Sequence, residues 1–315
     1  RSSLVTGVQT CALPISKGII MKGFYSIWLE EVDSKRYALI RIGFSILLLF
    51  HFLWLLPYSD SLLTNEGIST SEMSAIGFNE LTGGKSISIF KVFQTPASVS
   101  LLLLSAIVLC VLSIFGKYSR IAFVYCFLIQ LSIIHRAPIS TTGWDSIITN
   151  LCIILILSPL GTNWNPVSLI KNQNLKDSNI TNPRYGLVLI QIQTCVIYWQ
   201  SVFQKMGDYY WKNGESITYF LLSHHGRYQG KWPVQFHDFL DKMNYLTLLI
   251  ELSLPVLLCL SKTRFIGVVL GIGFHVGIAI LGINLGLFSL TMITCYLAFY
   301  PIWESSTKAK NTLKS

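Results

Sequence analysis

Eight apolar runs separated by polar links are the feature that most constrains this chain of 315 residues. About 20 apolar residues can cross a bilayer as a helix, and shorter runs can be tilted or re-entrant. Backbone groups in lipid must be hydrogen-bonded inside the protein, so such runs fold as helices. The sequence therefore predicts an all-α, polytopic transmembrane bundle of about eight spans. The spans are expected at about 37–56, 96–115, 121–135, 146–160, 187–205, 245–261, 265–281 and 284–301.

Composition also points to the membrane. Hydrophobic residues make up 52% of the chain and charged residues 12%, whereas about a quarter of a soluble domain is charged. The formal net charge of +9 is read first as a sign of membrane topology, because basic residues flank membrane spans on the cytoplasmic side. The lipid bilayer is the expected partner, and no nucleic acid is expected.

The distribution of charge predicts which face is which. If both termini are cytoplasmic, the cytoplasmic segments hold 14 Lys or Arg and 5 Asp or Glu, and the spans with the opposite loops hold 9 and 10. Such an excess on one face follows the positive-inside rule. We therefore expect a multi-pass protein of the bacterial inner membrane, with two long polar loops, 57–94 and 206–242, on the non-cytoplasmic face.

The ends of the chain are predicted separately from the bundle. Residues 1–16 look like a translated sequencing adapter and are expected to be non-native, with Met21 as the start. Residues 17–36 are expected to form an interfacial segment, helical over 21–36, because charged and aromatic residues alternate there. The transmembrane domain is expected over 37–303, and a basic cytoplasmic tail over 304–315.

The fifth run is unusually polar for a membrane span. It contains Gln191, Gln193, Tyr198 and Gln200 and ends on Lys205, and each polar group in lipid needs a partner in the protein. Two interpretations of Lys205 stay open. It is either an interfacial lysine whose ammonium reaches toward water, or a partly desolvated amine that acts as a general base.

Glu251 lies in the middle of the sixth run. A carboxylate at that depth is costly and is expected to face a partner inside the bundle, with Arg41 and His275 as candidates. His275 is alternatively a core histidine with its hydrogen bonds satisfied. Asp145 begins the fourth run, where it is either a helix N-cap or a polar site residue.

No metal site is predicted. Metal or haem binding needs two or more ligands at matched depth, and the histidines within the apolar runs lie on three different spans without a paired spacing. These histidines are His51, His135 and His275.

A set of motifs in fixed order resembles the horizontally transferred transmembrane (HTTM) domain family, over about residues 30–303. This domain is homologous to the membrane part of vitamin K-dependent gamma-carboxylase. The motifs are Arg41-Ile-Gly, Gly143-Trp-Asp145, Tyr198 followed by Lys205, Trp211-Lys-Asn-Gly214, Leu249-Ile-Glu251, Phe274-His275 and Gly286-Leu-Phe288.

The resemblance implies a lysine base that deprotonates a vitamin K-like hydroquinone, and Lys205 stands at that position. Together with the polar residues singled out in the apolar runs, this gives Lys205, Asp145, Glu251 and His275 as the candidate catalytic residues; Asp145 stands where the carboxylase has a histidine. The resemblance makes Tyr198, Trp211 and Arg41 the candidates for binding a quinone cofactor. In size and layout the chain also resembles the SdpB-like branch, whose members act with a partner protein to mature a secreted antimicrobial peptide.

Two functional hypotheses follow. The first is an enzyme-like membrane protein that acts on a quinone or a secreted peptide at the non-cytoplasmic face, with carboxylase-like or quinone-linked lyase or oxidoreductase chemistry. The second is a non-catalytic scaffold that holds a secreted peptide and a partner protein, in which the intramembrane polar groups only tie helices together.

Overall fold

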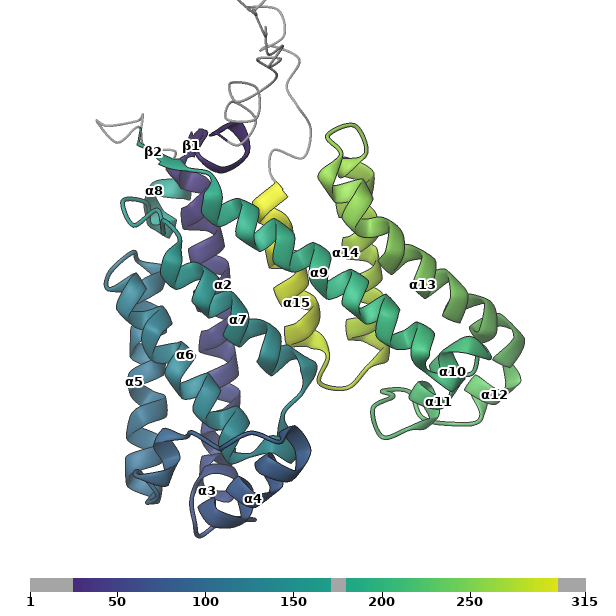
Figure 1. The fold of residues 1–315 in the computed structure, drawn as a ribbon, viewed down its shortest axis with the longest axis horizontal. Coiled ribbons are helices and arrows are strands. Elements are labelled where there is room, and N and C mark those ends of the chain that lie inside the picture. The colour runs from purple at the N-terminus through teal and green to yellow at the C-terminus, as the bar shows by residue number, and fades with distance from the viewer. Residues whose placement is uncertain (1–24, 171–179, 300–315) are drawn as a thin grey trace, which may run out of the picture.

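The computed structural model describes residues 25–170 and 180–299. Each predicted apolar run forms a helix, and these helices alternate in direction (Figure 1). The predicted non-native segment 1–16 and the basic tail 304–315 lie outside the described residues. The helices are α2 (Ser34–Leu55), α5 (Pro96–Ile114), α6 (Ser119–Arg136), α7 (Gly143–Leu157), α9 (Tyr185–Gly207), α13 (His237–Cys259), α14 (Arg264–Leu281) and α15 (Gly286–Cys295), the last continued by η4 (Tyr296–Phe299).

The predicted all-α membrane fold is confirmed. Among the described residues, five helical stretches are long and apolar enough to cross a membrane. They are Ser34–Leu63, Pro96–Ile114, Tyr185–Gly207, His237–Cys259 and Arg264–Leu281, and two shorter apolar helices cover Gly143–Leu157 and Gly286–Phe299. Strands are limited in this part of the chain to the short antiparallel pair β1 (Glu31–Asp33) and β2 (Thr181–Pro183).

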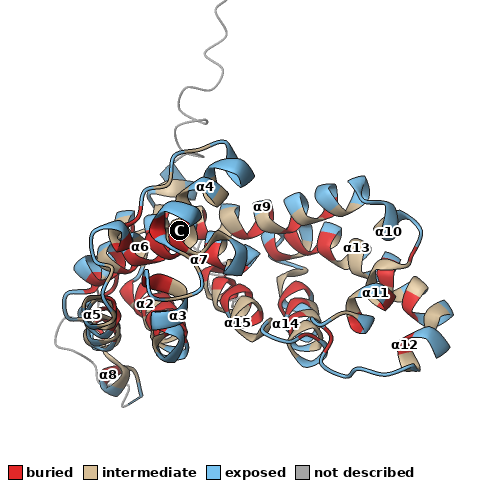
Figure 2. Cartoon of the chain, turned by 90° about the horizontal axis from the view of Figure 1, so that it is seen from below, coloured by how far each residue is buried: buried red, intermediate tan, exposed pale blue. Residues whose placement is uncertain are grey.

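The buried apolar side chains form two clusters. The larger joins α2, α5, α6 and α7, and the smaller joins α9, α13 and α14 with α15 and η4. Figure 1 shows α15 between the two groups of helices, and Figure 2 shows buried residues on the inward helix faces and exposed residues on the outward faces. Large apolar side chains such as Leu101, Phe203 and Leu249 are exposed. Apolar outer faces of this kind suit contact with lipid chains.

The two predicted long loops contain short helices. The loop over 57–94 contains η1 (Leu56–Tyr58), α3 (Ser59–Leu63), α4 (Ser71–Thr82) and η2 (Ile89–Lys91). The loop over 206–242 contains α10 (Tyr209–Lys212), α11 (Ser216–Leu222) and α12 (Trp232–Gln235), and α13 begins within it. Both loops lie at one end of the bundle, and the β1–β2 pair lies at the other (Figure 1). η3 (Pro138–Ser140) links α6 to α7, and α8 (Pro166–Ile170) follows α7.

Buried Arg136 holds the first of these loops on the bundle. Its Nη2 donates to the backbone oxygens of Thr64 at 2.7 Å and Ser69 at 2.6 Å, and its Nη1 donates to the Ser74 hydroxyl at 2.6 Å. Hydrogen bonds from a charged donor are stronger than neutral ones. The loop is therefore fixed by polar contacts at the end of α6.

The predicted helix over 21–36 is interrupted in its described part, where residues 25–28 are helical and a strand follows. Glu31–Asp33 pairs with Thr181–Pro183 as a strand, and α2 begins at Ser34. The Asp33 carboxylate accepts a hydrogen bond from the Lys35 amide at 2.8 Å, so the sequence carries a helix-start signal at this point. The strand pair then joins the start of α2 to the start of α9.

The shared end of the two loops generates a prediction about topology. We expect a reporter domain inserted after residue 175 to lie in the cytoplasm, because the basic links gather on that face. A reporter inserted between Gly83 and Gly84, at the tip after α4, should lie on the opposite face. A fluorescent protein and alkaline phosphatase at each position measure this, and the reverse pattern would contradict the assigned orientation.

Candidate functional site

The polar side chains of α9 lie along one face of that helix. Gln191, Thr194, Tyr198, Ser201 and Lys205 follow at intervals of three or four residues, which places them on a single stripe. Gln191 Nε2 donates to the Ala298 carbonyl at 2.7 Å, and the other members approach α13, α14 and η4. A groove of about 530 Å³ lined by Val196, Trp199, Gln200, Phe203 and Gln204 lies on the opposite side of α9.

Lys205 and Glu251 form an ion pair between α9 and α13. Lys205 Nζ lies 2.6 Å from both Glu251 carboxylate oxygens, and the side chains are 20% and 7% exposed. The Ser201 hydroxyl donates to Glu251 Oε2 at 3.3 Å. The same ammonium lies over the Trp211 ring, with the ring centroid 4.5 Å from Nζ. The charge thus contacts both a carboxylate and an aromatic face.

The segment after α9 places Trp211 over the lysine. The Asp208 carboxylate accepts from the Trp211 amide at 3.1 Å, and Asn244 Nδ2 donates to the Trp211 carbonyl at 2.8 Å. Gly214 has φ +77°, and a Cβ there would lie 1.5 Å from Asp241 Oδ1. A side chain at position 214 would therefore displace Asp241 and strain the backbone. This geometry accounts for the glycine in the Trp211-Lys-Asn-Gly214 motif.

A second polar group lies two turns before Lys205 along α9. The Tyr198 hydroxyl is hydrogen-bonded to His275 Nε2 at 2.6 Å and to the Tyr296 hydroxyl. His275 is fully buried, and among the described residues its Nδ1 has no hydrogen-bond partner. Tyr198 and Lys205 belong to the same stripe of α9, and Ser201 between them donates to Glu251. The ion pair and this tyrosine–histidine network therefore lie along one face of α9.

Asp145 lies in the other group of helices, which contains α2, α5, α6 and α7. Its Oδ1 accepts from Gln130 Nε2 at 2.7 Å, and its Oδ2 accepts from the Thr142 amide at 2.6 Å. Thr142 is the N-cap of α7 and Asp145 is the third helical residue, so the two form a capping box. The N-cap is therefore Thr142, and Asp145 caps the helix start from the third helical position instead of the N-cap position predicted for it. Among the hydrogen bonds and ion pairs of the described residues, none links Asp145 to Lys205 or Glu251.

Arg41 is also outside the site, which corrects the prediction that it pairs with Glu251. Its Nη1 donates to the Leu160 and Gly161 carbonyls at 2.9 and 2.8 Å, and its Nη2 donates to the Trp164 carbonyl at 2.5 Å. The side chain is completely buried. Arg41 therefore fastens the segment after α7 to α2 near the β1–β2 end. His275 likewise hydrogen-bonds Tyr198 and not Glu251.

Comparison with known proteins identifies the chain. The model of the HTTM domain family matches residues 30–303. The chain belongs to the HTTM domain family. Together with the apolar helices, this match makes it an integral membrane protein. It shows no significant similarity to a curated protein or to a solved structure.

Sequence reasoning missed three residues of this HTTM site, namely Ser201, Asn244 and Tyr296. Ser201 had a signal, because it lies four residues before Lys205 on the same helix face. Asn244 lies two helical turns before Glu251, on the same face of α13. Tyr296 had none. Its approach depends on Gly271, where a Cβ would lie 2.2 Å from the Tyr296 hydroxyl oxygen.

The Arg41 contacts generate a stability prediction for this HTTM protein. We expect Arg41→Met to lower the free energy of unfolding by roughly 3 kcal/mol or more, because buried carbonyls lose a charged donor. Thermal unfolding of the purified protein in detergent measures the change. Lys117→Met, an exposed basic residue at the same end of the bundle, is the control. An unchanged midpoint for Arg41→Met would contradict the anchoring role.

Proposed function

We propose that this HTTM protein is a membrane enzyme whose Lys205 removes a proton from a quinol-type substrate at the non-cytoplasmic face. The observation that carries the proposal is the position of the Lys205 amino group. It is only partly exposed at the end of α9, and it contacts both the Glu251 carboxylate and the Trp211 ring. The family's homology to the membrane domain of vitamin K-dependent gamma-carboxylase supports the same chemistry.

The proposed step is a single proton transfer. In its neutral form, the Lys205 amine accepts a proton from a hydroquinone hydroxyl, so that an O–H bond breaks and an N–H bond forms. The products are a hydroquinone anion and an ammonium. Glu251 and Trp211 stabilise the ammonium, because a carboxylate within hydrogen-bonding distance and an aromatic face both favour a positive charge. No other covalent change is part of this proposal.

The surroundings of the site favour an amphiphilic aromatic substrate. Tyr210 packs edge to face on Tyr219 with ring centroids 5.0 Å apart, next to the segment that carries Trp211. Aromatic rings contact apolar ring systems well and accept polar groups at their edges. Tyr198 and Trp211 are the proposed contacts for the quinol ring. Asp145 and Arg41 are not assigned to this site, because their side chains are hydrogen-bonded within the group of helices that contains α2, α6 and α7.

Substitution of the lysine tests the proposal directly. The full-length protein is titrated anaerobically with a naphthohydroquinone, and the absorbance of the hydroquinone anion is followed against pH. We expect the protein to stabilise the anion, so that it forms at a lower pH than in detergent alone. Lys205→Met should abolish this shift, whereas Lys212→Met, on the neighbouring short helix, should preserve it. An anion signal of equal size in Lys205→Met would rule out Lys205 as the base.

The scaffold hypothesis has an observation of its own. The Lys205–Glu251 pair joins α9 to α13 and satisfies a buried carboxylate, which a purely structural tie would also do. In that case the protein would hold a secreted peptide and a partner protein without chemistry.

A double substitution separates the two functions. Lys205→Met with Glu251→Met removes both charges, and replacing a buried pair by apolar residues is often neutral for stability. We expect the double variant to keep the unfolding midpoint of the unsubstituted protein. It should no longer stabilise the hydroquinone anion. Glu251→Met alone should fold less well, because it leaves Lys205 without its carboxylate. Peptide maturation that survives the double substitution would favour the scaffold.

A further inference from the structure

A cavity at the β1–β2 end of the bundle is separate from the Lys205 site. It has a volume of about 400 Å³, within the range of small-molecule sites. Tyr185 at its rim begins α9 and Lys205 lies near the end of that helix. At about 1.5 Å per helical residue, roughly 30 Å separates them. This cavity is therefore independent of the proposed enzymatic site, and a result at one does not decide the other.

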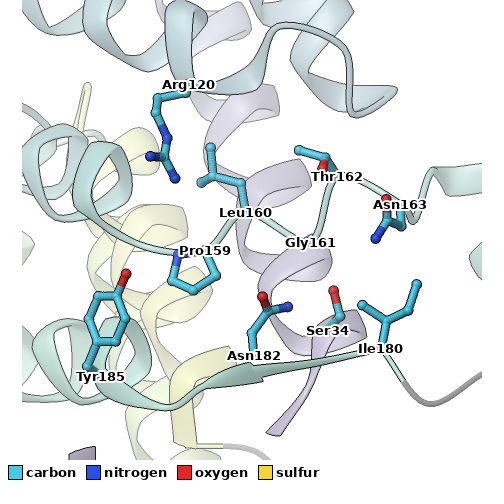
Figure 3. A pocket seen from close by; sticks show the side chains of 10 residues that line it. All are labelled: Ser34, Arg120, Pro159, Leu160, Gly161, Thr162, Asn163, Ile180, Asn182 and Tyr185. Atoms are coloured by element: carbon cyan, nitrogen blue, oxygen red, sulfur yellow. The ribbon is translucent and has the colours of Figure 1, made fainter. Parts of the chain in front are cut away.

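The cavity is lined mainly by hydrogen-bonding groups from five segments of the chain. Figure 3 shows the Arg120 guanidinium and the Ser34 hydroxyl approaching the same space from opposite walls. None of the ten lining residues is acidic. Its polar side chains are those of Ser34, Arg120, Thr162, Asn163, Asn182 and Tyr185.

Several of these groups have unused hydrogen-bonding capacity. Ser34 is 1% exposed, and its hydroxyl has no hydrogen-bond partner among the residues that the structure describes. Arg120 Nη2 donates to the Ser158 carbonyl at 3.2 Å. In the ranges that the structure describes, no carboxylate forms an ion pair with Arg120, and the side-chain amides of Asn163 and Asn182 make no hydrogen bond. A buried hydroxyl without a partner lowers stability, so a ligand that accepts a hydrogen bond from this hydroxyl would be favoured.

The charge of the surroundings selects an anion. Arg120 supplies a guanidinium to the cavity wall, and the Lys35 ammonium lies nearby, 4.5 Å above the ring of Trp164. A guanidinium together with amide and hydroxyl donors converging from several directions suits the oxygens of a phosphate group. The volume leaves room for the group to which the phosphate is attached.

We propose that this cavity binds a phosphate group, carried either by an anionic phospholipid headgroup or by a free phosphate compound. The cavity lies on the face that the basic links assign to the cytoplasm. Basic pockets between membrane helices on that side are suited to phosphate headgroups. Arg120 forms the charged contact, Ser34 donates its hydroxyl hydrogen, and the amides of Asn163 and Asn182 complete the site.

The test measures both sources on the full-length protein. Native mass spectrometry reports the fraction of protein that retains phosphatidylglycerol after exchange with phosphatidylcholine micelles. Thermal unfolding in detergent reports stabilisation by inorganic phosphate against sodium chloride at equal ionic strength. The variant is Arg120→Gln, and the matched control is Lys117→Gln, which removes the same charge from the same turn but does not line the cavity. We expect Arg120→Gln to weaken binding roughly tenfold.

The two measurements distinguish the sources. Retention of phosphatidylglycerol that depends on Arg120 assigns a lipid headgroup, and stabilisation by inorganic phosphate that depends on Arg120 assigns a free phosphate compound. Binding of neither ligand, binding unchanged in Arg120→Gln, or an equal loss in Lys117→Gln would overturn the proposal.

Ser34→Ala provides a second test that does not depend on Arg120. Removing a buried hydroxyl without a partner should leave the unfolding midpoint of the ligand-free protein unchanged or raise it. The same substitution should weaken phosphate or lipid binding several-fold. A merely structural cavity would show no effect on binding, and that result would also overturn the proposal.

Discussion

Polar groups within a lipid-embedded bundle must find their partners inside the protein, and this constraint organises the structure. Three cations of the described helices meet it in different ways. Lys205 pairs with Glu251, whereas Arg41 and Arg136 donate to carbonyl and hydroxyl oxygens without a carboxylate. Each solution joins segments that are distant in sequence, because the oxygens come from other helices or loops. The cations therefore help to fix the tertiary arrangement as well as being accommodated by it.

The Lys205 site differs from the other two in what surrounds the charge. Arg41 and Arg136 are almost completely buried and bonded to backbone oxygens, which suits anchoring. Lys205 retains some exposure and faces an aromatic ring, and the same face of α9 carries Tyr198, which is hydrogen-bonded to His275. Groups that can change their proton state while remaining hydrogen-bonded are the ones that can exchange protons with a substrate.

The two ends of α9 have different chemistry. Its last turn carries the ion pair and lies beside α10 of the second long loop, and its first residue borders the polar cavity near the β1–β2 pair. A membrane helix with polar groups at both ends connects the two faces through a rigid element. The basic turn around Arg120 thus has a local role beyond topology, because it supplies the charged wall of the cavity.

The sequence by itself determined the eight apolar helices and their order, but not the short helices within the long loops. The apolar runs are long, and their charge pattern separates two faces. It also marked Lys205 and Glu251, because charged residues inside apolar runs stand out. Only the tertiary structure decided which charges pair. Helical periodicity fixes the face on which a residue lies, but not the helix that packs against that face. Glu251 therefore pairs with Lys205 instead of Arg41, and Asp145 belongs to the group of helices around α2. Helix packing, and not the order of the motifs, sets these distances.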